Sequence, residues 1–201
     1  MCVKLILIRH GETDWSHSRK YCGFSDIPLN RRGRDQAQQF CRIFEKEKVH
    51  KIYSSDMKRT LQFAKIIFKD MPVECLPELR EINFGLFEGL TYQEIMDRYS
   101  EVYTRWINNP FIVSIPGGES LEDLAGRVKM ALTKILSSNH RKRVAVFTHA
   151  GPIRIILGEI LKLKAGKIWN IEQDLANMSV IEFINGRGNV RLLKGIRILD
   201  E

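Results

Sequence analysis

The sequence predicts an α/β protein built as a three-layer α/β/α sandwich around a mostly parallel sheet. Short apolar runs that suit strands alternate along the chain with segments whose apolar residues recur every three or four positions, as in amphipathic helices. Two of the runs, Val3–Ile8 and Val144–Thr148, are apolar at nearly every position, which is typical of strands buried on both faces. A length of 201 residues with 44% hydrophobic and 28% charged residues suits a single domain spanning residues 1–201.

The first half of the chain continues this alternation after its opening strand, which we expect at the centre of the sheet. Asn30 is the expected N-cap of a helix over about residues 31–48, whose apolar side chains fall on one face. Residues 50–54 then return to the sheet. Asp56 is the expected N-cap of the following helix, so Arg59 falls within the first turn of that helix.

The middle of the chain is less regular. A short strand around residues 72–76 leads into an extended segment, 79–85, and a helix is expected over about 91–99. Residues 100–118 predict a short helix and a loop that covers the edge of the sheet where the functional residues gather. Residues 120–136 predict a further helix, which a serine caps at its start.

The last part of the chain returns to the sheet twice. Pro152 suits the first turn of a helix that follows the second fully apolar strand. Residues 179–184 and 190–195 are strand-like, and the stretch Asn185-Gly-Arg-Gly188 joins them. This pattern predicts a hairpin at the edge of the sheet.

The formal net charge of +8 raises the question of a nucleic-acid partner, because clustered Lys and Arg neutralise phosphates. The basic residues are instead spread over the helical segments 31–48 and 58–69, where they suit solvated helix faces. The sequence lacks a groove-reading motif and an interleaving of basic with aromatic residues. We therefore expect no nucleic-acid partner, and a basic pocket for an anionic small molecule accounts for part of the excess charge.

The cysteine pattern and the apolar runs bear on metal binding and location. The chain has four cysteines, Cys2, Cys22, Cys41 and Cys75. They form no Cys-x-x-Cys pair and have no regular spacing, which disfavours both a zinc site and a disulfide framework. The longest apolar run near the start, Leu5–Ile8, is too short for a signal peptide or a membrane span. We expect a cytoplasmic protein with reduced thiols, no membrane partner and no metal.

Basic and imidazole side chains follow three of the predicted strands. Arg9 and His10 follow the first strand, Arg59 comes shortly after the second, and His149 follows Val144–Thr148. The carboxyl ends of parallel strands lie along one edge of a sheet, where ligands bind, so these four side chains are expected to converge on one anion. Two histidines and two arginines without an evident metal site favour phosphoryl chemistry on a histidine nucleophile.

Phosphoryl transfer divides the work among these groups. Its transition state spreads negative charge over the equatorial oxygens, and fixed cations and N–H donors stabilise that charge. Arg9 and Arg59 would supply permanent charge, and a protonated His149 at a helix N-terminus would add a donor. His10 would attack phosphorus through one neutral ring nitrogen while a local carbonyl holds the other.

The reaction also needs a general acid, because an alkoxide leaves poorly until it is protonated. Glu81 is the first candidate, since it ends an extended segment just before a glycine-containing loop. It would protonate the leaving oxygen and then deprotonate the attacking water. Glu78, Glu88 and Glu119 are competitors that composition alone leaves open.

Four segments, in this order along the chain, together resemble the signature of the histidine phosphatase superfamily, the phosphoglycerate mutase-like group. They are Arg9-His-Gly-Glu-Thr13, Ser54-Ser-Asp-Met-Lys-Arg-Thr60, Leu79-Arg-Glu-Ile-Asn-Phe-Gly85 and Thr148-His-Ala-Gly151. The resemblance covers roughly residues 3–160, and it implies a phosphoglycerate mutase-like fold.

The resemblance also implies roles for the residues at the matching positions. It implies that His10 carries the phosphoryl group and that Glu81 donates the proton. It implies that three further residues bind the phosphate, namely Arg9, Arg59 and His149.

Two further substrate-binding residues are expected on weaker grounds. The family often has an asparagine that contacts the phosphate where this chain has Ser16, and the shorter hydroxyl would reach the phosphate through water. Gly23 lies in a segment that resembles the family loop whose backbone lines the pocket.

The substrate is the difficult question within the family. The runs Glu81–Ile95 and Pro116–Ser120 look most similar to α-ribazole-5′-phosphate phosphatases of cobalamin nucleotide-loop assembly, and they also resemble broad-specificity phosphatases and fructose 2,6-bisphosphate bisphosphatase domains. The short segment after the acid-bearing loop, with Arg98 and Arg105 as its nearby basic residues, favours a phosphatase over a mutase. Packing is the first expectation for Trp106 and Phe111, but an apolar wall beside the phosphate would use Phe84, Phe87, Trp106 and Phe111.

We therefore predict a phosphomonoesterase that removes the 5′-phosphate of α-ribazole 5′-phosphate, takes a small phosphate ester as its partner and needs no cofactor. A broad-specificity or sugar-phosphate phosphatase and then a phosphoglycerate mutase are the alternatives. The rival from another class is a non-catalytic phospho-ligand binding module, which the retention of both His10 and Glu81 disfavours. The sequence leaves open whether the chain forms a homodimer.

Overall fold

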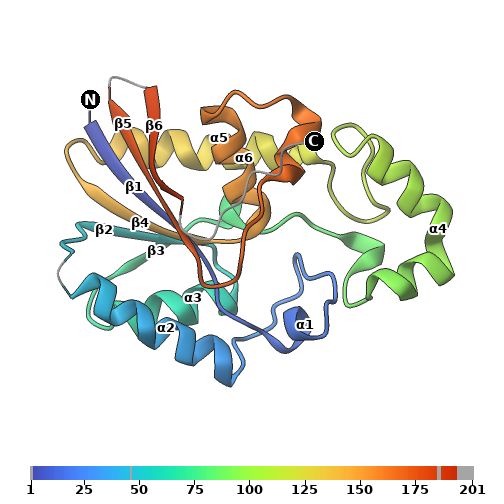
Figure 1. The fold of residues 1–201 in the computed structure, drawn as a ribbon, viewed down its shortest axis with the longest axis horizontal. Coiled ribbons are helices and arrows are strands. Elements are labelled where there is room, and N and C mark those ends of the chain that lie inside the picture. The colour runs from blue at the N-terminus through green and yellow to red at the C-terminus, as the bar shows by residue number, and fades with distance from the viewer. Residues whose placement is uncertain (1, 46, 185–186, 194–201) are drawn as a thin grey trace.

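β1 (Cys2–Arg9) lies inside a sheet that the described residues build from six strands in the order β3-β2-β4-β1-β5-β6 (Figure 1). The computed structural model describes residues 2–45, 47–184 and 187–193. β1 to β4 pair in parallel, whereas β5 and β6 join antiparallel, so the predicted mostly parallel sheet is confirmed. The other strands are β2 (Lys51–Ser54), β3 (Val73–Cys75), β4 (Arg143–Thr148), β5 (Met178–Ile184) and β6 (Arg187–Leu193).

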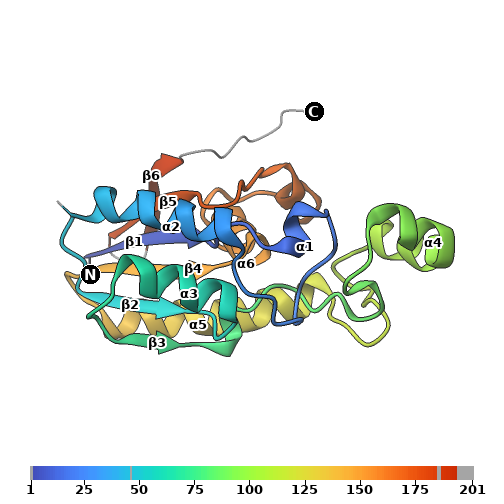
Figure 2. The ribbon, with the colours of Figure 1, turned by 90° about the horizontal axis from the view of Figure 1, so that it is seen from below.

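Helices cover both faces of this sheet and give the predicted three layers (Figure 2). One face carries α2 (Arg31–Phe44) and α3 (Lys58–Ile67). The opposite face carries α5 (Leu121–Ser138) and α6 (Ala150–Ile160). Each pair of helices packs against the sheet through its own hydrophobic core, so the sheet is buried on both sides.

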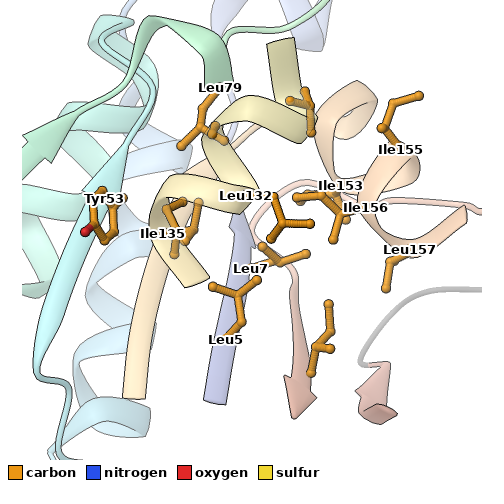
Figure 3. Close-up of a cluster of buried hydrophobic side chains, with 14 of the residues drawn as sticks. Leu5, Leu7, Tyr53, Leu79, Leu132, Ile135, Ile153, Ile155, Ile156 and Leu157 are labelled. Carbon is orange, nitrogen blue, oxygen red and sulfur yellow. The ribbon is translucent and has the colours of Figure 1, made fainter. Parts of the chain in front are cut away.

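The apolar run of β1 is shared between these two cores. Successive side chains of a strand point to opposite faces, so a run without alternation suits a strand that is covered on both sides. Leu5 and Leu7 belong to the core under α5 and α6, and Figure 3 shows them beside Leu132 of α5. Ile6 and Ile8 belong to the core under α2 and α3. The predicted central position of β1 is confirmed.

The helices on the α2–α3 face begin and end for different reasons. Asn30 caps α2 as predicted, since its side chain accepts a hydrogen bond from Gly33 N–H at 2.9 Å. α2 ends at Phe44, earlier than predicted, because Phe44 is its last core side chain and the chain then turns toward β2. The predicted cap at Asp56 is wrong, because the Asp56 carboxylate accepts a hydrogen bond from Arg80 Nε at 2.7 Å instead.

α4 (Tyr92–Asn108) stands beyond the end of the sheet in both Figure 1 and Figure 2. The first helical segment of α4 ends at Tyr99, as predicted. Tyr99 has non-helical backbone angles, φ −140° and ψ 29°, and the chain kinks there and continues as a helix to Asn108. Away from the sheet, α4 packs on a separate small cluster made by Phe87, Ile95, Trp106 and Ile115.

Short elements and a hairpin complete the described fold. The hairpin strands β5 and β6 lie at the sheet edge as predicted, and β6 starts at Arg187 rather than near residue 190. The first two residues of the predicted connection, 185–186, lie outside the described residues. Among the helices of the described chain, none is long and apolar enough to cross a membrane. The short elements are α1 (Asp14–His17), η1 (Pro77–Leu79), η2 (Gly85–Phe87) and η3 (Ala165–Asn170).

Candidate active site

Parallel pairing of β1 with β4 brings the two predicted histidines together. In the register of these strands Arg9 lies opposite Thr148, so His10 and His149 leave the sheet side by side. The backbone N–H of His10 donates to the carbonyl of Thr148 at 3.2 Å. The two imidazole rings meet edge to face, with centroids 5.1 Å apart and an interplanar angle of 65°.

The hydrogen bonds of His10 fix which ring nitrogen carries the proton. Nδ1 lies 2.7 Å from the carbonyl oxygen of Gly11, and a carbonyl can only accept, so Nδ1 is the protonated nitrogen of the neutral ring. Nε2 then keeps its lone pair. The local carbonyl that the sequence predicts is therefore present, and it leaves Nε2 as the unprotonated ring nitrogen.

His149 has the opposite tautomer. Arg59 Nε donates to His149 Nδ1 at 3.2 Å, and an arginine can only donate, so Nδ1 accepts and Nε2 carries the proton. The predicted protonated form of His149 is therefore wrong for this structure. The Nε2–H of the neutral ring has no hydrogen-bond partner among the described residues, and it remains a donor for a ligand oxygen.

Burial and neighbouring charge keep both histidines neutral. The pKa of His10 lies well below its ordinary value because the ring is desolvated and Arg59 and Arg9 lie close to it. The pKa of His149 is lowered in the same way, first by burial and then by Arg59. A neutral imidazole is the form that can attack phosphorus.

Arg59 is itself almost completely buried, with 1% of its surface exposed. It lies in the first turn of α3, as the sequence predicts. Nη1 donates to the carbonyl of Ser25 at 2.9 Å and Nη2 donates to the carbonyl of Gly23 at 2.7 Å. With Nε on His149, three of the five N–H groups of this guanidinium are engaged by described residues, and Arg59 lies outside the residues that line the cavity.

Arg9 is the second guanidinium at this edge, and it is partly buried. Its Nη1 donates to the backbone carbonyl of Gln173, while its Nε has no partner among the described residues. Burial lowers the pKa of Arg9 to about 10, although Glu81 opposes the shift, and the group stays charged at neutral pH. Gln173 Nε2 is a further buried donor that lacks a partner in the described chain.

Glu81 alone of the four candidate glutamates lines the cavity. Its Oε1 accepts from the N–H groups of Ile82 at 2.9 Å and Gly151 at 3.0 Å. A Cβ on Gly151 would lie 2.1 Å from Glu81 Oε1, so only glycine allows this close approach. The carboxyl group is held beside the helix start that carries His149.

Two of the three competing glutamates have other partners, and the third lies outside the cavity lining. Glu88 accepts hydrogen bonds from four backbone N–H groups, those of Gly23, Phe24, Ser25 and Phe84. Glu119 pairs with Arg127, and Glu78 does not line the cavity. Of the four carboxylates, the structure therefore places only that of Glu81 at the described cavity, a choice that composition leaves open.

The two weaker substrate-binding candidates are placed differently. Ser16 lines the cavity, but its hydroxyl already accepts from Thr13 N–H at 2.8 Å and donates to the Thr13 carbonyl at 2.9 Å. Gly23 lies behind the cavity wall, which the neighbouring Cys22 forms. The N–H of Gly23 donates to Glu88 and its carbonyl accepts from Arg59, so its backbone supports a guanidinium.

The cavity over His10 has a volume of about 690 Å³. Sequence reasoning missed much of its lining, which also includes Thr13, Arg19, Lys20, Tyr21, Ala150, Arg154 and the segment 173–175. Arg154 lies about one turn into α6 from His149, and that spacing is the one signal that indicates it. The segment 173–175 lies outside regular structure, so periodicity gives no sign of it.

The predicted aromatic wall is largely wrong. Of the four aromatic residues proposed for it, Phe84 lines the cavity. Phe87 and Trp106 are buried in the cluster of α4, and Phe111 packs against the core under α5 and α6. The described residues 100–118 also stay out of the cavity lining, because they pack around α4 instead of over the edge of the sheet.

The structure also bears on the expectations for the cysteines, of which Cys22 lines the cavity, and for metal binding. All four cysteines are free thiols. Burial raises the pKa of the Cys22 thiol to about 11, so this cavity residue stays protonated. In the described part of the chain, no three or more His, Cys, Asp or Glu residues are grouped as a metal site requires.

An α/β sandwich with two neutral histidines, one buried arginine and one partly buried arginine at one sheet edge has the architecture of a phosphoesterase. The sequence matches the histidine phosphatase superfamily (branch 1) over residues 5–195. The chain belongs to this superfamily, and it is a phosphomonoesterase.

Three known proteins illustrate the likeness. Phosphoserine phosphatase 1 of Hydrogenobacter thermophilus is 35% identical over 192 residues, which cover 94% of this chain and 90% of that protein. Phosphoglycerate mutase-like protein 4 of Arabidopsis thaliana is 40% identical over 157 residues, covering 76% of this chain and 68% of that protein. The crystal structure of the alpha-ribazole phosphatase from Shigella flexneri superposes with a TM-score of 0.88 at 26% identity, covering 98% of this chain and 99% of that chain.

The two depressed histidine pKa values predict that stability falls as the pH drops below about 6.5, the ordinary pKa of histidine. In that range the unfolded chain protonates His10 and His149, whereas the folded protein keeps them neutral. The unfolded state then binds more protons, and each histidine lowers the free energy of unfolding by up to about 1.4 kcal/mol per pH unit. Urea unfolding at pH 7.5, 6.5 and 5.5 measures this slope. His10→Gln should flatten it, and an unchanged slope would contradict the assignment.

Proposed function

We propose that this enzyme hydrolyses phosphate monoesters through a phosphohistidine formed on Nε2 of His10. The observation that carries the proposal is the hydrogen bond of Nδ1 to the Gly11 carbonyl, which leaves the Nε2 lone pair free in a cavity. In the first step the N–P bond forms as the ester O–P bond breaks. In the second step water attacks phosphorus, the N–P bond breaks, and inorganic phosphate leaves.

Three groups are proposed to stabilise the charge on the transferred phosphoryl group. Arg9 and Arg59 are permanent cations with N–H groups to spare, and the Nε2–H of His149 is an unused buried donor. Buried donors that are already oriented need no reorganisation when charge develops, so they lower the barrier. A neutral His149 suffices for this role, because its Nε2–H donates without a net charge.

Glu81 is proposed as the general acid and base. A protonated Glu81 gives its proton to the leaving alkoxide in the first step, and the resulting carboxylate takes a proton from water in the second. Its place in the cavity lining and its proximity to the start of α6 support this role. The same carboxyl group returns to its starting state after each turnover.

The substrate we propose carries further charged groups on its alcohol portion, as O-phosphoserine does. Arg19, Lys20 and Arg154 line the cavity along with Asp174, so both a carboxylate and an ammonium group would find opposite charges there. The likeness to phosphoserine phosphatase 1 supports this choice. α-Ribazole 5′-phosphate, the substrate predicted from the sequence, is the second candidate. Tyr21 and Phe84 would pack against its aromatic base.

His10→Ala should abolish turnover, because the described cavity offers no second free imidazole nitrogen to accept the phosphoryl group. Wild-type enzyme quenched during turnover should carry phosphate that is stable to alkali and labile to acid, located on His10 by peptide mapping. His140→Ala, an exposed histidine, is the matched control and should keep full activity. Substantial turnover by the His10 variant would disprove the covalent mechanism.

Glu81→Gln should lower kcat/KM on alkyl phosphates by roughly 10²–10⁴-fold, the usual contribution of general acid–base catalysis. The loss should be smaller on p-nitrophenyl phosphate, because its phenolate leaves without protonation. Glu78→Gln is the control, since Glu78 lies outside the cavity lining. Equal losses on both esters, with no phosphoenzyme accumulating, would mean that Glu81 is not the acid.

A panel of phosphate esters tests the substrate class. O-phosphoserine should have a higher kcat/KM than α-ribazole 5′-phosphate, and Arg154→Met should reduce that ratio because it removes one of the cavity cations. Steady-state phosphate release at equal enzyme concentration gives the comparison. A preference for α-ribazole 5′-phosphate that Arg154→Met leaves unchanged would contradict O-phosphoserine as the substrate and favour α-ribazole 5′-phosphate instead.

A further inference from the structure

A guanidinium outside the cavity holds the loop that carries Glu81. Arg127 of α5 donates through Nη1 to the carbonyl of Glu78 at 3.0 Å and to that of Arg80 at 2.6 Å. Its Nη2 donates to the carbonyl of Glu81 at 2.7 Å and to Glu119 Oε2 at 2.7 Å. Its Nε donates to Glu119 Oε1 at 2.8 Å. All five N–H groups of Arg127 are therefore used, three of them on the backbone of one loop.

Glu119 also binds the loop that carries Glu81. Besides both bonds from Arg127, its Oε2 accepts from Asn83 N–H at 2.9 Å, and its own N–H donates to the Asn83 carbonyl at 2.9 Å. The side chains of Arg127 and Glu119 are 13% and 19% exposed, so solvent weakens this pair little. The loop 78–83 is thus tied to α5 and to the segment before it.

This loop depends on such contacts because it is irregular. Residues 80–84 belong to no helix or strand, so the loop has no ladder of its own to satisfy its carbonyl groups. A carbonyl that is withdrawn from water without a partner is costly, and Arg127 donates to three partly buried carbonyls, those of Arg80, Glu81 and the preceding Glu78 of η1. The backbone of Glu81 is held by Arg127, while its carboxylate is held separately by Ile82 and Gly151 N–H.

We propose that Arg127, with Glu119 as its partner, is a positioning residue for proton transfer by Glu81. Arg127 does not line the cavity, so it acts through the backbone it holds. A misplacement of about 1 Å of a reacting group can cost about 10²-fold in rate. This inference rests on the proposed role of Glu81 as the general acid and base.

A second contact of Arg127 offers the competing explanation. Its guanidinium lies 5.7 Å from the ring centroid of Phe24, and that of Arg80 lies 5.1 Å from the same ring. Phe24 sits between the two residues whose carbonyls accept from Arg59. Arg127 would then act through Arg59 on phosphate binding. Inhibition by inorganic phosphate reports on Arg59, and dependence on the leaving group reports on Glu81.

The test compares Arg127→Met with wild type on an alkyl phosphate and on p-nitrophenyl phosphate. Methionine keeps an apolar stem but removes all five donors. We expect a loss of about 10²-fold in kcat/KM on the alkyl ester and a much smaller loss on the aryl ester. The inhibition constant of inorganic phosphate should stay within about twofold, since Arg9, Arg59 and His149 are untouched. In a Glu81→Gln background, Arg127→Met should add little further loss.

Arg143→Met is the matched control, because Arg143 pairs with Glu47 at the opposite end of β4. It should leave both activities unchanged. If circular dichroism shows that Arg127→Met does not fold, Arg127→Lys and Glu119→Gln carry the same comparison, since each removes part of the hydrogen-bonding set.

Equal losses on both esters, a matching rise in the phosphate inhibition constant, or additive losses with Glu81→Gln would each overturn the positioning role. The proposed function can fail separately. If Glu81→Gln itself shows no leaving-group dependence, Glu81 is not the acid and the role of Arg127 falls with it. If Glu81→Gln shows the dependence and Arg127→Met does not, only the inference about Arg127 is wrong.

Discussion

The burial of the Arg59 guanidinium is the constraint on which the rest of the site depends. A charge taken out of water is costly unless it is paired and hydrogen-bonded, yet this side chain is 1% exposed. It donates hydrogen bonds to the carbonyls of Gly23 and Ser25 and to the ring of His149. Because Arg59 donates to Nδ1 of His149, it decides the tautomer of that ring. Its charge also helps to hold the pKa of His10 low.

The carboxylates around the site differ in what they contact: two are bonded within the cavity's surroundings, and the third, the proposed general acid and base, faces the cavity. Glu88 has its oxygens occupied by the N–H groups of the loop that supports Arg59, so it fixes the cation from behind. Glu119 is engaged with Arg127, which holds the loop of Glu81. Glu81 is the one of these three that lines the cavity. Glu88 and the Arg127–Glu119 pair thus hold the loops that carry, or bind to, the groups at the cavity.

The described cavity combines side chains from regular elements with side chains from loops. The residues proposed to bind the phosphoryl group come from strand ends and helix starts, which the sheet holds in place. The parts that face the alcohol come from loops and from Arg154 on α6, together with the segment 173–175. Loops can change without disturbing the sheet, so the phosphoryl chemistry and the choice of alcohol are separable.

The sequence by itself determined the layers, the central strand, and the placing of Arg9, His10, Arg59 and His149 at one edge. The layers and the central strand follow from local hydrophobic periodicity. The shared edge follows from the geometry of parallel strands, whose carboxyl ends lie together. Only the tertiary structure decided the tautomers of the histidines, the partner of Asp56 and the ranking of the glutamates. These depend on contacts between residues far apart in the chain, such as Arg59 with His149 and Arg127 with the loop of Glu81. Pairwise hydrogen bonding across loops leaves no periodic trace in the sequence, so it becomes visible only when the chain is folded.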